Sequence, residues 1–317
     1  MPWLLNVVYV CLAVVASPWL IYRATCQGKY REGWSKKLLG KVPSRVTSAP
    51  CAWFHAVSVG EVLLLRPVVA SFARRHPDWD IVISTSTSTG LDVARRTYPE
   101  LVTFHAPLDF TWATRRAMAR IRPRLLVLVE LELWPNLIRA AKEVGAKVAI
   151  INGRLSARSF RGYMWVQGWL RSTLRRLDLV AAQNLEYGGR FLSLGVPEVR
   201  LKMTGSVKFD GLETNRANSR TLSLRRTLGL KSSDVVFVAG STMEGEEEAA
   251  LAAFRSARAD HPGLRLIVVP RHPHRFDAVA SMLEREGERV RRRSRSELAP
   301  LLQTTSDRAE VTLVDTL

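Results

Sequence analysis

The chain has 317 residues, 47% hydrophobic and 24% charged, which argues against wholesale disorder and favours two domains over one. Its three cysteines form no CxxC pair and give no sign of a disulfide framework or a zinc site. The net charge of +18 indicates an anionic partner: nucleic acid, anionic lipid or a phosphorylated substrate. We expect no nucleic-acid partner, because the chain lacks a Cys/His finger, an RNP-like aromatic pattern and an obvious recognition helix. The basic run 291–295 is expected to be a solvated face or a loop.

The N-terminal segment is apolar. No charged residue occurs from Pro2 to Tyr22, and a helix of that length spans ~30 Å, about one hydrocarbon core. Basic residues follow it: Arg23, Lys29, Arg31, Lys36, Lys37, Lys41 and Arg45. By the positive-inside rule we predict that residues 1–28 are a membrane anchor and that the body lies on the cytoplasmic face of the inner membrane. Asn6 and Pro18 weaken a strict span, so a helix lying in the interface stays open.

Past this segment, short apolar runs alternate with helical patterns. Strands are predicted at 52–57, 80–85, 102–106, 125–130, 147–151 and 179–182. Helices are predicted at 62–75, 91–98, 111–121, 137–144, 161–177 and 187–194. Repeated βα units of this kind predict an α/β fold with a doubly wound parallel sheet, in which ligands bind outside the carboxyl ends of the strands.

A second series of βα units follows a polar stretch, 204–219, which we interpret as a linker. Strands are predicted at 235–239, 264–269 and 311–314, and helices at 244–259 and 275–286. We therefore assign residues 29–205 to a first Rossmann-like domain and 206–317 to a second one. Only two or three units fit before Leu317, so the second domain is expected to be incomplete.

The segment HAVSVGE joins the first strand to the first helix and ends at Glu61. A carboxylate there feels the positive end of the helix dipole and can accept a proton from a hydroxyl nucleophile. Ser58 and Glu61 also have the S-x-x-E spacing of a capping box, which is the structural alternative.

The segment STSTSTG opens the next helix. Its hydroxyls and glycine are candidate ligands for phosphate or sugar oxygens, namely Ser84, Thr85, Thr87, Thr89 and Gly90. Such strand exits are also common helix caps, so both interpretations stay open.

Acidic and basic side chains end two neighbouring strands. Glu130 and Glu132 follow the most apolar strand, where a charge needs a partner or a function. Arg154, Ser156 and Arg158 follow the next strand and would suit a phosphorylated acceptor. Alternatively, these arginines pair with the two glutamates.

Later motifs offer further candidates. Lys208 lies in TGSVKFD on the expected linker, and Pro270 and Arg271 follow a strand of the second domain, where an arginine can meet a nucleotide phosphate. His272 and His274 have an i, i+2 spacing interrupted by proline, which is poor for metal binding, so no metal is expected.

These motifs together resemble the Kdo (3-deoxy-D-manno-octulosonic acid) transferases, glycosyltransferases of the GT-B type with two Rossmann-like domains. The matching stretches are KYREGW, HAVSVGE, STSTSTG, ELELWPN, NGRLSARS, AAQN, TGSVKFD, GSTMEGEE and PRHPHRF. The resemblance implies an inverting transfer of Kdo from CMP-Kdo to a lipid A precursor, a tetraacylated disaccharide (lipid IVA), at the membrane during lipopolysaccharide synthesis, without metal or other cofactor. The first domain would bind the acceptor and the second the donor.

The resemblance also implies residue roles. Glu61 would be the general base, Glu130 and Lys208 would stabilise the transition state, and Pro270 with Arg271 would hold CMP. The hydroxyls of STSTSTG and the polar residues after the fifth strand would contact the acceptor.

The chain departs from the family pattern in three places. Met243 stands where histidine is usual, and Gly153 replaces the usual alanine. The later glycine-rich donor segment and a GGHN-type motif do not occur before Leu317, so we expect the chain as given not to turn over. Two other functions stay open: a non-catalytic protein that binds lipid A precursor, and another membrane GT-B glycolipid transferase.

Overall fold

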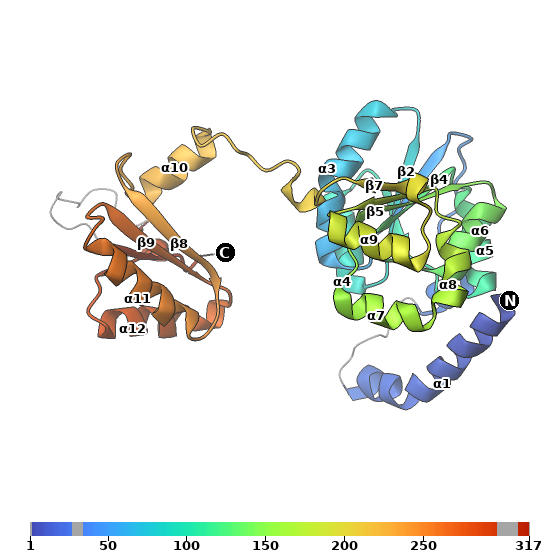
Figure 1. Cartoon of the computed structure of the whole chain (residues 1–317), viewed down its shortest axis with the longest axis horizontal. Coiled ribbons are helices and arrows are strands. Elements are labelled where there is room, and N and C mark those ends of the chain that lie inside the picture. The colour runs from blue at the N-terminus through green and yellow to red at the C-terminus, as the bar shows by residue number, and fades with distance from the viewer. Residues whose placement is uncertain (1, 27–33, 297–309, 317) are drawn as a thin grey trace. The chain divides into compact units, whose positions relative to one another are not determined.

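The structure is a computed structural model that describes residues 2–26, 34–296 and 310–316. The chain divides into two compact units, Met1–Leu212 and Glu213–Leu317 (Figure 1). Each unit is an α/β fold built on a parallel sheet, which confirms that part of the predicted fold class. The division between the units falls inside the polar stretch 204–219.

Unit 1 contains a seven-stranded parallel sheet in the order β3-β2-β1-β4-β5-β6-β7. Its strands are β1 Cys51–His55, β2 Asp80–Thr85, β3 Val102–His105, β4 Leu125–Val129, β5 Lys147–Gly153, β6 Leu179–Ala182 and β7 Leu201–Met203. β1 is buried along its whole length and β4 at every residue but its first, as runs of apolar residues in a parallel sheet should be. The order reverses between β1 and β4, so crossovers leave the two strands in opposite directions.

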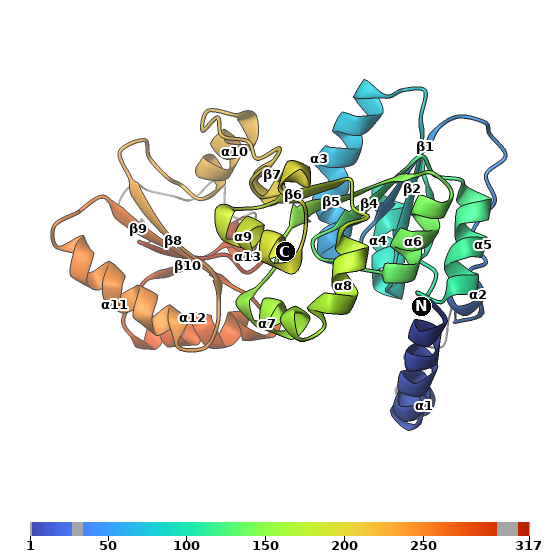
Figure 2. The same cartoon turned by 45° about the vertical axis from the view of Figure 1, so that its right-hand side comes forward.

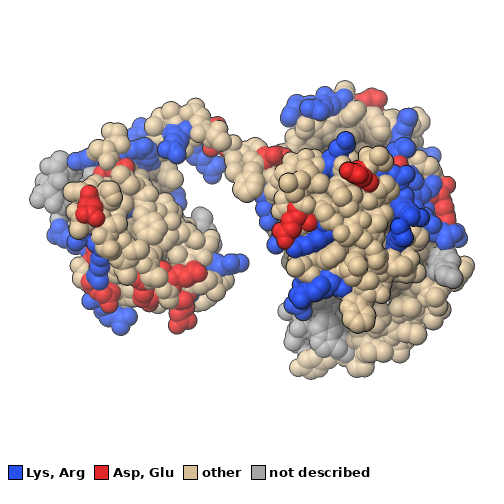
Figure 3. All heavy atoms as spheres, viewed as in Figure 1, with Lys and Arg blue, Asp and Glu red and all other residues tan. Residues whose placement is uncertain are grey.

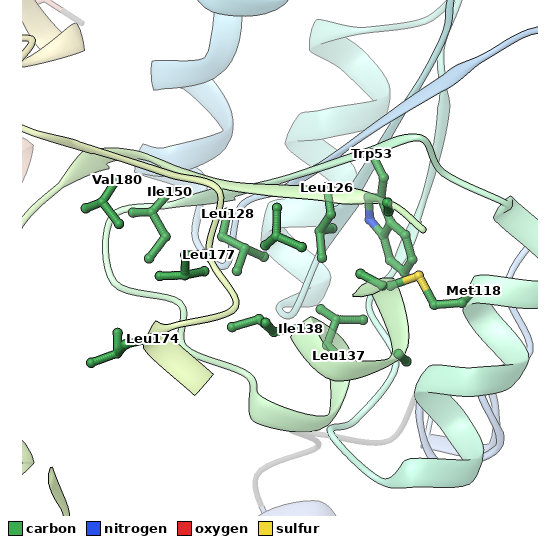
Figure 4. Packing of buried hydrophobic residues seen from close by; sticks show 14 of the residues in the cluster. Trp53, Met118, Leu126, Leu128, Leu137, Ile138, Ile150, Leu174, Leu177 and Val180 are labelled. Carbon is green, nitrogen blue, oxygen red and sulfur yellow. The ribbon is translucent and has the colours of Figure 1, made fainter. Parts of the chain in front are cut away.

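Helices cover both faces of this sheet. The helices of unit 1 that follow the strands are α3 Val59–Arg75, α4 Ser88–Thr97, α5 Thr111–Ile121, α6 Pro135–Glu143, α7 Ala157–Trp165, α8 Gln167–Leu174 and α9 Leu185–Leu194. Three shorter helices are α2 Trp34–Leu39 and the 3-10 turns η1 Glu198–Arg200 and η2 Val207–Phe209. Successive residues of β1 belong to different cores. Trp53 lies beside Met118 of α5 (Figure 4) in a cluster that also includes buried residues of α6, α8 and α9, whereas Phe54 belongs to the cluster with α3 and α4.

The prediction of one helix over 161–177 is wrong. The chain forms α7 and α8 instead, and the break falls at Val166, whose φ and ψ are −111° and 16°. The break leaves Trp165 91% exposed beside partly exposed Trp169. In a single continuous helix, Trp165 and Trp169 would lie one turn apart on the same face.

The N-terminal helix α1, Pro2–Cys26, is docked onto unit 1 through buried polar groups. The Asn6 amide donates to Thr111 Oγ1 (2.7 Å), and its oxygen accepts the Thr111 N–H (3.1 Å). Tyr9 donates to Asp109 (3.0 Å). Among the described residues no helix is long and apolar enough to cross a membrane, so the predicted span is not confirmed.

Unit 2 contains a four-stranded parallel sheet in the order β10-β11-β9-β8 (Figure 2). Its elements are α10 Ser219–Thr227, β8 Val235–Thr242, α11 Glu246–Arg258, β9 Leu264–Pro270, η3 Pro273–Arg275, α12 Phe276–Arg285, β10 Val290–Arg292, α13 Arg293–Ser296 and β11 Val311–Leu313. The interpretation of 291–295 as a solvated face or loop is corrected here. Its first residues lie in β10, and Arg292 pairs with Asp277 (2.6 Å) and Asp315 (2.7 Å).

Replacing Asn6 by Ala should loosen α1 from unit 1. The change leaves the buried Thr111 N–H without its acceptor and should cost about 1–3 kcal/mol of docking free energy. Hydrogen exchange of residues 3–10, followed by mass spectrometry, measures the effect. Ser17→Ala is the control, because the Ser17 hydroxyl donates only within α1, to the Val14 carbonyl. Equal exchange in Asn6→Ala and wild type would contradict the docking role.

Candidate active site

Three carboxylates gather where the strand order of unit 1 reverses. Glu61 lies in the first turn of α3, directly after β1, and Glu130 and Glu132 follow β4, the strand beside β1. Ligands of open α/β sheets bind at this position, outside the carboxyl ends of the strands. Burial is the main cause that raises the pKa of Glu61 and of Glu132; the charge of Glu130 adds to the rise for Glu61, and the charges of Glu61 and Glu130 add to the rise for Glu132.

The Glu61 side chain is held by the start of its own helix. Its two carboxylate oxygens accept the Val57 N–H (2.9 Å) and the Ser58 hydroxyl (2.9 Å), while the Glu61 N–H donates to Ser58 Oγ (3.4 Å). The predicted capping box is therefore present. Burial raises the pKa of Glu61, these hydrogen bonds oppose the rise, and Glu130 adds to it. A carboxylate with a raised pKa is a stronger base than an ordinary one, so capping and proton transfer are compatible.

Glu130 has a left-handed backbone, with φ of 58°. Its N–H still donates to the Ile151 carbonyl of β5 (2.9 Å), so the chain turns directly after its last sheet hydrogen bond. A non-glycine residue in this conformation is strained, and such strain is concentrated at functional sites. After this turn at Glu130, a short loop carries Glu132 and Trp134, and α6 begins at the next residue, Pro135.

Glu132 is the most perturbed of the three acids. The Trp134 indole N–H donates to its Oε2 (2.8 Å). The pKa of Glu132 is raised to about 7, first by burial and then by Glu61 and, less strongly, Glu130, against the hydrogen bond from Trp134. The sequence interpretation assigned no separate role to Glu132, although ELELW, with its acids two residues apart before an indole, was the available signal.

His55 supports this loop from the end of β1. Its ring is 1% exposed and lies edge-on to Trp134, with the ring centres 6.5 Å apart. Its Nδ1 lies 2.9 Å from the Ser84 hydroxyl, which also accepts the Trp53 indole N–H (2.7 Å). Burial lowers the pKa of His55 to about 4, so the ring is neutral at pH 7. Sequence reasoning did not single out this histidine.

The hydroxyl segment STSTSTG lies beside the loop that leads to Glu61, because β2 is the neighbour of β1. Thr85 and Thr87 both donate to the Val57 carbonyl, at 3.0 and 3.3 Å, and so tie the two strand exits together. Ser84 and Thr85 are buried, whereas Thr87 and Thr89 are exposed at the start of α4. A Cβ on Gly90 would lie 2.5 Å from Thr85 Oγ1, so this position requires glycine.

The polar residues after β5 follow the strand next to β4. The helix α7, which begins among them, lies close to Glu132: burial is the main cause that raises the pKa of Tyr163 in α7, and the charge of Glu132 adds to the rise. Ser156 caps α7 by accepting the Ser159 N–H (3.1 Å), and Arg154 and Arg158 are exposed. Neither arginine forms an ion pair with Glu130 or Glu132 in the part of the chain that the structure describes, so the alternative that they neutralise these acids is not supported.

Lys208 lies in η2, which packs against α3, the helix that carries Glu61. Its side chain is exposed. Nearby, Gly153 explains one departure from the family pattern. A Cβ there would lie 3.1 Å from the Ala181 carbonyl oxygen and 3.2 Å from the Phe191 ring, so alanine would require a local shift.

In unit 2, two strand exits are tied together by a buried ion pair. Glu247 is 1% exposed and accepts two hydrogen bonds from Arg275, at 2.8 and 3.0 Å, and one from Thr242 (2.7 Å). Burial opposes ionisation, but these donors hold the pKa of Glu247 below its ordinary value. Pro270 is buried, and Arg271 is exposed with its N–H bound to the Thr242 carbonyl (3.0 Å).

The two histidines of this loop, which the sequence analysis considered for metal binding, are His272 and His274. Their rings are stacked, with centres 5.4 Å apart. Within residues 2–26, 34–296 and 310–316, no group of three or more His, Cys, Asp or Glu side chains is arranged to hold a metal ion.

Residues 32–211 match the family described as 3-deoxy-D-manno-octulosonic-acid transferase (kdotransferase). The 3-deoxy-D-manno-octulosonic acid transferase of Haemophilus influenzae is 37% identical over 247 residues, which cover 78% of this chain and 57% of that protein. The chain belongs to the Kdo transferase family. The family member of Bordetella pertussis is 34% identical over 287 residues, covering 87% of this chain and 65% of that protein. The chain thus spans about three fifths of these relatives' length.

Solved structures share the fold at low sequence identity. A UDP-GlcNAc 2-epimerase from Neisseria meningitidis has a TM-score of 0.56 at 12% identity, covering 84% of this chain and 72% of its own. A glycosyltransferase from Rickettsia africae has a TM-score of 0.52 at 10% identity, covering 84% and 68%. These similarities support the two-unit α/β architecture expected for the family.

The raised pKa of Glu132 predicts a pH-dependent stability of unit 1. Because the folded pKa of about 7 exceeds the ordinary 4.5, the folded state holds more protons than the unfolded state between these values. Stability is therefore lost as pH rises through this window, by about 1–2 kcal/mol after allowance for solvent screening. Glu132→Gln should lack this loss.

Tryptophan fluorescence measures this effect selectively, because all nine tryptophans lie in unit 1. Urea unfolding at pH 5 and pH 8 gives the change in free energy for each protein. The buried His55 also titrates, but it contributes equally to wild type and Glu132→Gln and cancels in the comparison. The same pH dependence in both proteins would show that Glu132 has an ordinary pKa.

Proposed function

We propose that the protein takes part in an inverting transfer of Kdo from CMP-Kdo to a lipid A precursor. The observation that carries this proposal is Glu61, held by its capping box where the strand order reverses, beside two further carboxylates and with a raised pKa. Membership of the Kdo transferase family supports the substrate class.

In the proposed reaction Glu61 accepts the proton of the acceptor hydroxyl. The hydroxyl oxygen then bonds to the anomeric carbon of Kdo, and the bond from that carbon to the phosphate oxygen breaks. CMP leaves with the electron pair, and attack opposite to the leaving group inverts the configuration. Glu130 offsets the positive charge that develops on the sugar ring, and Lys208 offsets negative charge. We assign no metal or other cofactor to this step.

Binding roles follow the positions of the remaining candidates. Pro270 and Arg271 form a donor-binding loop that the Glu247–Arg275 pair holds in place, and the exposed Arg271 is suited to the phosphate of CMP. In unit 1, the exposed Thr87, Thr89, Arg154 and Arg158 are suited to the phosphates and hydroxyls of the acceptor. Ser84, Thr85, Gly90 and Ser156 support this surface through buried contacts or caps.

Replacing Glu61 by Gln should lower kcat by about 10²–10⁴-fold while CMP binding stays unchanged, because only proton transfer is lost. Ser58→Ala is the matched control: it removes the capping hydroxyl, costs about 1 kcal/mol of stability and keeps the base. The assay follows Kdo transfer to tetraacylated disaccharide. It uses this chain joined to the C-terminal remainder of the Haemophilus influenzae relative, since the match covers 57% of that protein. A folded Glu61→Gln protein with wild-type turnover would refute the assignment.

We also propose that α1 attaches the protein to the cytoplasmic face of the inner membrane. Exposed apolar side chains lie along α1, no charged residue occurs from Pro2 to Tyr22, and the region of α1 is mostly tan in Figure 3. These exposed side chains are Trp3, Leu4, Val7, Val8, Val10, Leu12, Val14 and Val15. A docked helix with an exposed apolar surface suits the interfacial region of a bilayer, and the net charge of +18 favours anionic lipid.

Replacing Val14 and Val15 by Asp should lower binding to phosphatidylethanolamine–phosphatidylglycerol vesicles by at least about tenfold, because burying a carboxylate in lipid is costly. The two valines are 66% and 79% exposed, so folding should be unaffected. Val199→Asp is the matched control, since Val199 is 84% exposed in η1. Vesicle sedimentation at high salt isolates the apolar contribution. If only the control lost binding, another surface would carry the attachment.

A further inference from the structure

Asn152, in β5, has a left-handed backbone like that of Glu130, its neighbour in the sheet. Val129 and Ile151 are paired in register, and the residue after each has a positive φ, 58° for Glu130 and 52° for Asn152. The regular β4–β5 ladder therefore ends at this level, where β4 ends and β5 has a register shift before Gly153 pairs with β6, at the edge that carries the carboxylates. Asparagine is among the few non-glycine residues that tolerate this conformation.

The side chain of Asn152 is 1% exposed and binds the segment that precedes the division between the units. Its Oδ1 accepts the Val207 N–H (3.1 Å) and the Ser206 hydroxyl (3.4 Å). The Ser206 oxygen in turn accepts the Lys208 N–H (3.4 Å). One carboxamide oxygen thus fixes the backbone directly before Lys208.

In this segment the backbone is held in place, whereas the side chain of Lys208 reaches solvent. Val207 packs against the core between the sheet and α3, while the Lys208 side chain is exposed. The Asn152 Nδ2 is buried without a partner among the described residues. An unpaired buried donor is unfavourable, and an apolar side chain would avoid it, so the presence of an amide here indicates that its oxygen is needed.

We propose that Asn152 is a positioning residue for Lys208: it ties the Ser206–Lys208 segment to the sheet edge beside Glu130. This inference rests on the proposed function for the role of the lysine. The Asn152 side chain, and not the conformation of residues 206–208 alone, then sets the distance of the Lys208 backbone from the carboxylates.

The test uses Asn152→Gly, which keeps the left-handed backbone available and removes the acceptor. In the 317-residue chain, amide hydrogen exchange at Val207 and Lys208 should become about fivefold faster or more, while the unfolding free energy from urea titration of tryptophan fluorescence falls by no more than the ~1–3 kcal/mol expected for a lost buried acceptor. Gln183→Ala is the matched control: it removes the hydrogen bond to the Asn152 backbone carbonyl (3.1 Å) but leaves Oδ1 in place, so exchange at Val207 should not change. Unchanged exchange in Asn152→Gly would overturn the proposal.

A double-mutant cycle in the joined protein tests the link to Lys208. Asn152→Gly should lower kcat about tenfold or more with little change in KM, and should have no further effect in a Lys208→Ala background. Additive losses would show that Asn152 acts independently of Lys208 and would overturn the positioning role. The exchange measurement needs no substrate, so it decides the structural link even if Kdo transfer fails and the proposed function is wrong.

Discussion

Strands of a parallel sheet all end at one edge, and that geometric constraint organises unit 1. Each crossover returns the chain to the same side, so every loop that follows a strand opens on a common edge. Where the order reverses between β1 and β4, the loops diverge and leave room between them. Residues 69 positions apart in the chain, such as Glu61 and Glu130, become electrostatic neighbours there. The hydroxyl segment at the end of β2 and Asn152 near the end of β5 flank them.

Concentrating carboxylates at this edge has an energetic cost that the surrounding structure limits. Glu61 is stabilised by donors from its own helix start, and Glu132 by one indole N–H, so the two acids keep unequal affinities for a proton. Two titratable groups whose environments differ in this way can serve different roles in one reaction. In unit 2 the opposite arrangement occurs: Glu247 is more deeply buried but is neutralised by Arg275, which suits a residue that holds a loop in place.

Local pattern predicted much of this structure. The limits of β2, β6 and α5 agree with the predictions, because apolar runs bounded by polar residues mark strands and a 3.6-residue period marks helices. The short strands β7 and β10 and the helix α10 were not predicted: three residues carry too little pattern, and α10 buries no residue that would create one. The break at Val166 was also missed, since either side of it is helical.

Among the site residues, Glu61 and Glu130 could be predicted because motif and strand end coincide. The effect of Glu130 on the pKa of Glu61, the raised pKa of Glu132 and the contacts of His55 could not be predicted, because each depends on which strands become neighbours. The same holds for Arg292, whose partners Asp277 and Asp315 come from separate segments of unit 2. Burial and pairing are properties of the assembled sheet, whereas spacing along the chain reports only local geometry.

The docking of α1 through Asn6 has a consequence for how the protein would meet its lipid. A helix joined by a flexible tether would let the catalytic body tumble above the bilayer, and most encounters would occur in unproductive orientations. Hydrogen bonds at Asn6 and Tyr9 instead fix the orientation of α1 relative to the rest of unit 1. With α1 lying in the bilayer surface, as we propose, the search for the acceptor becomes lateral diffusion in two dimensions at a fixed tilt.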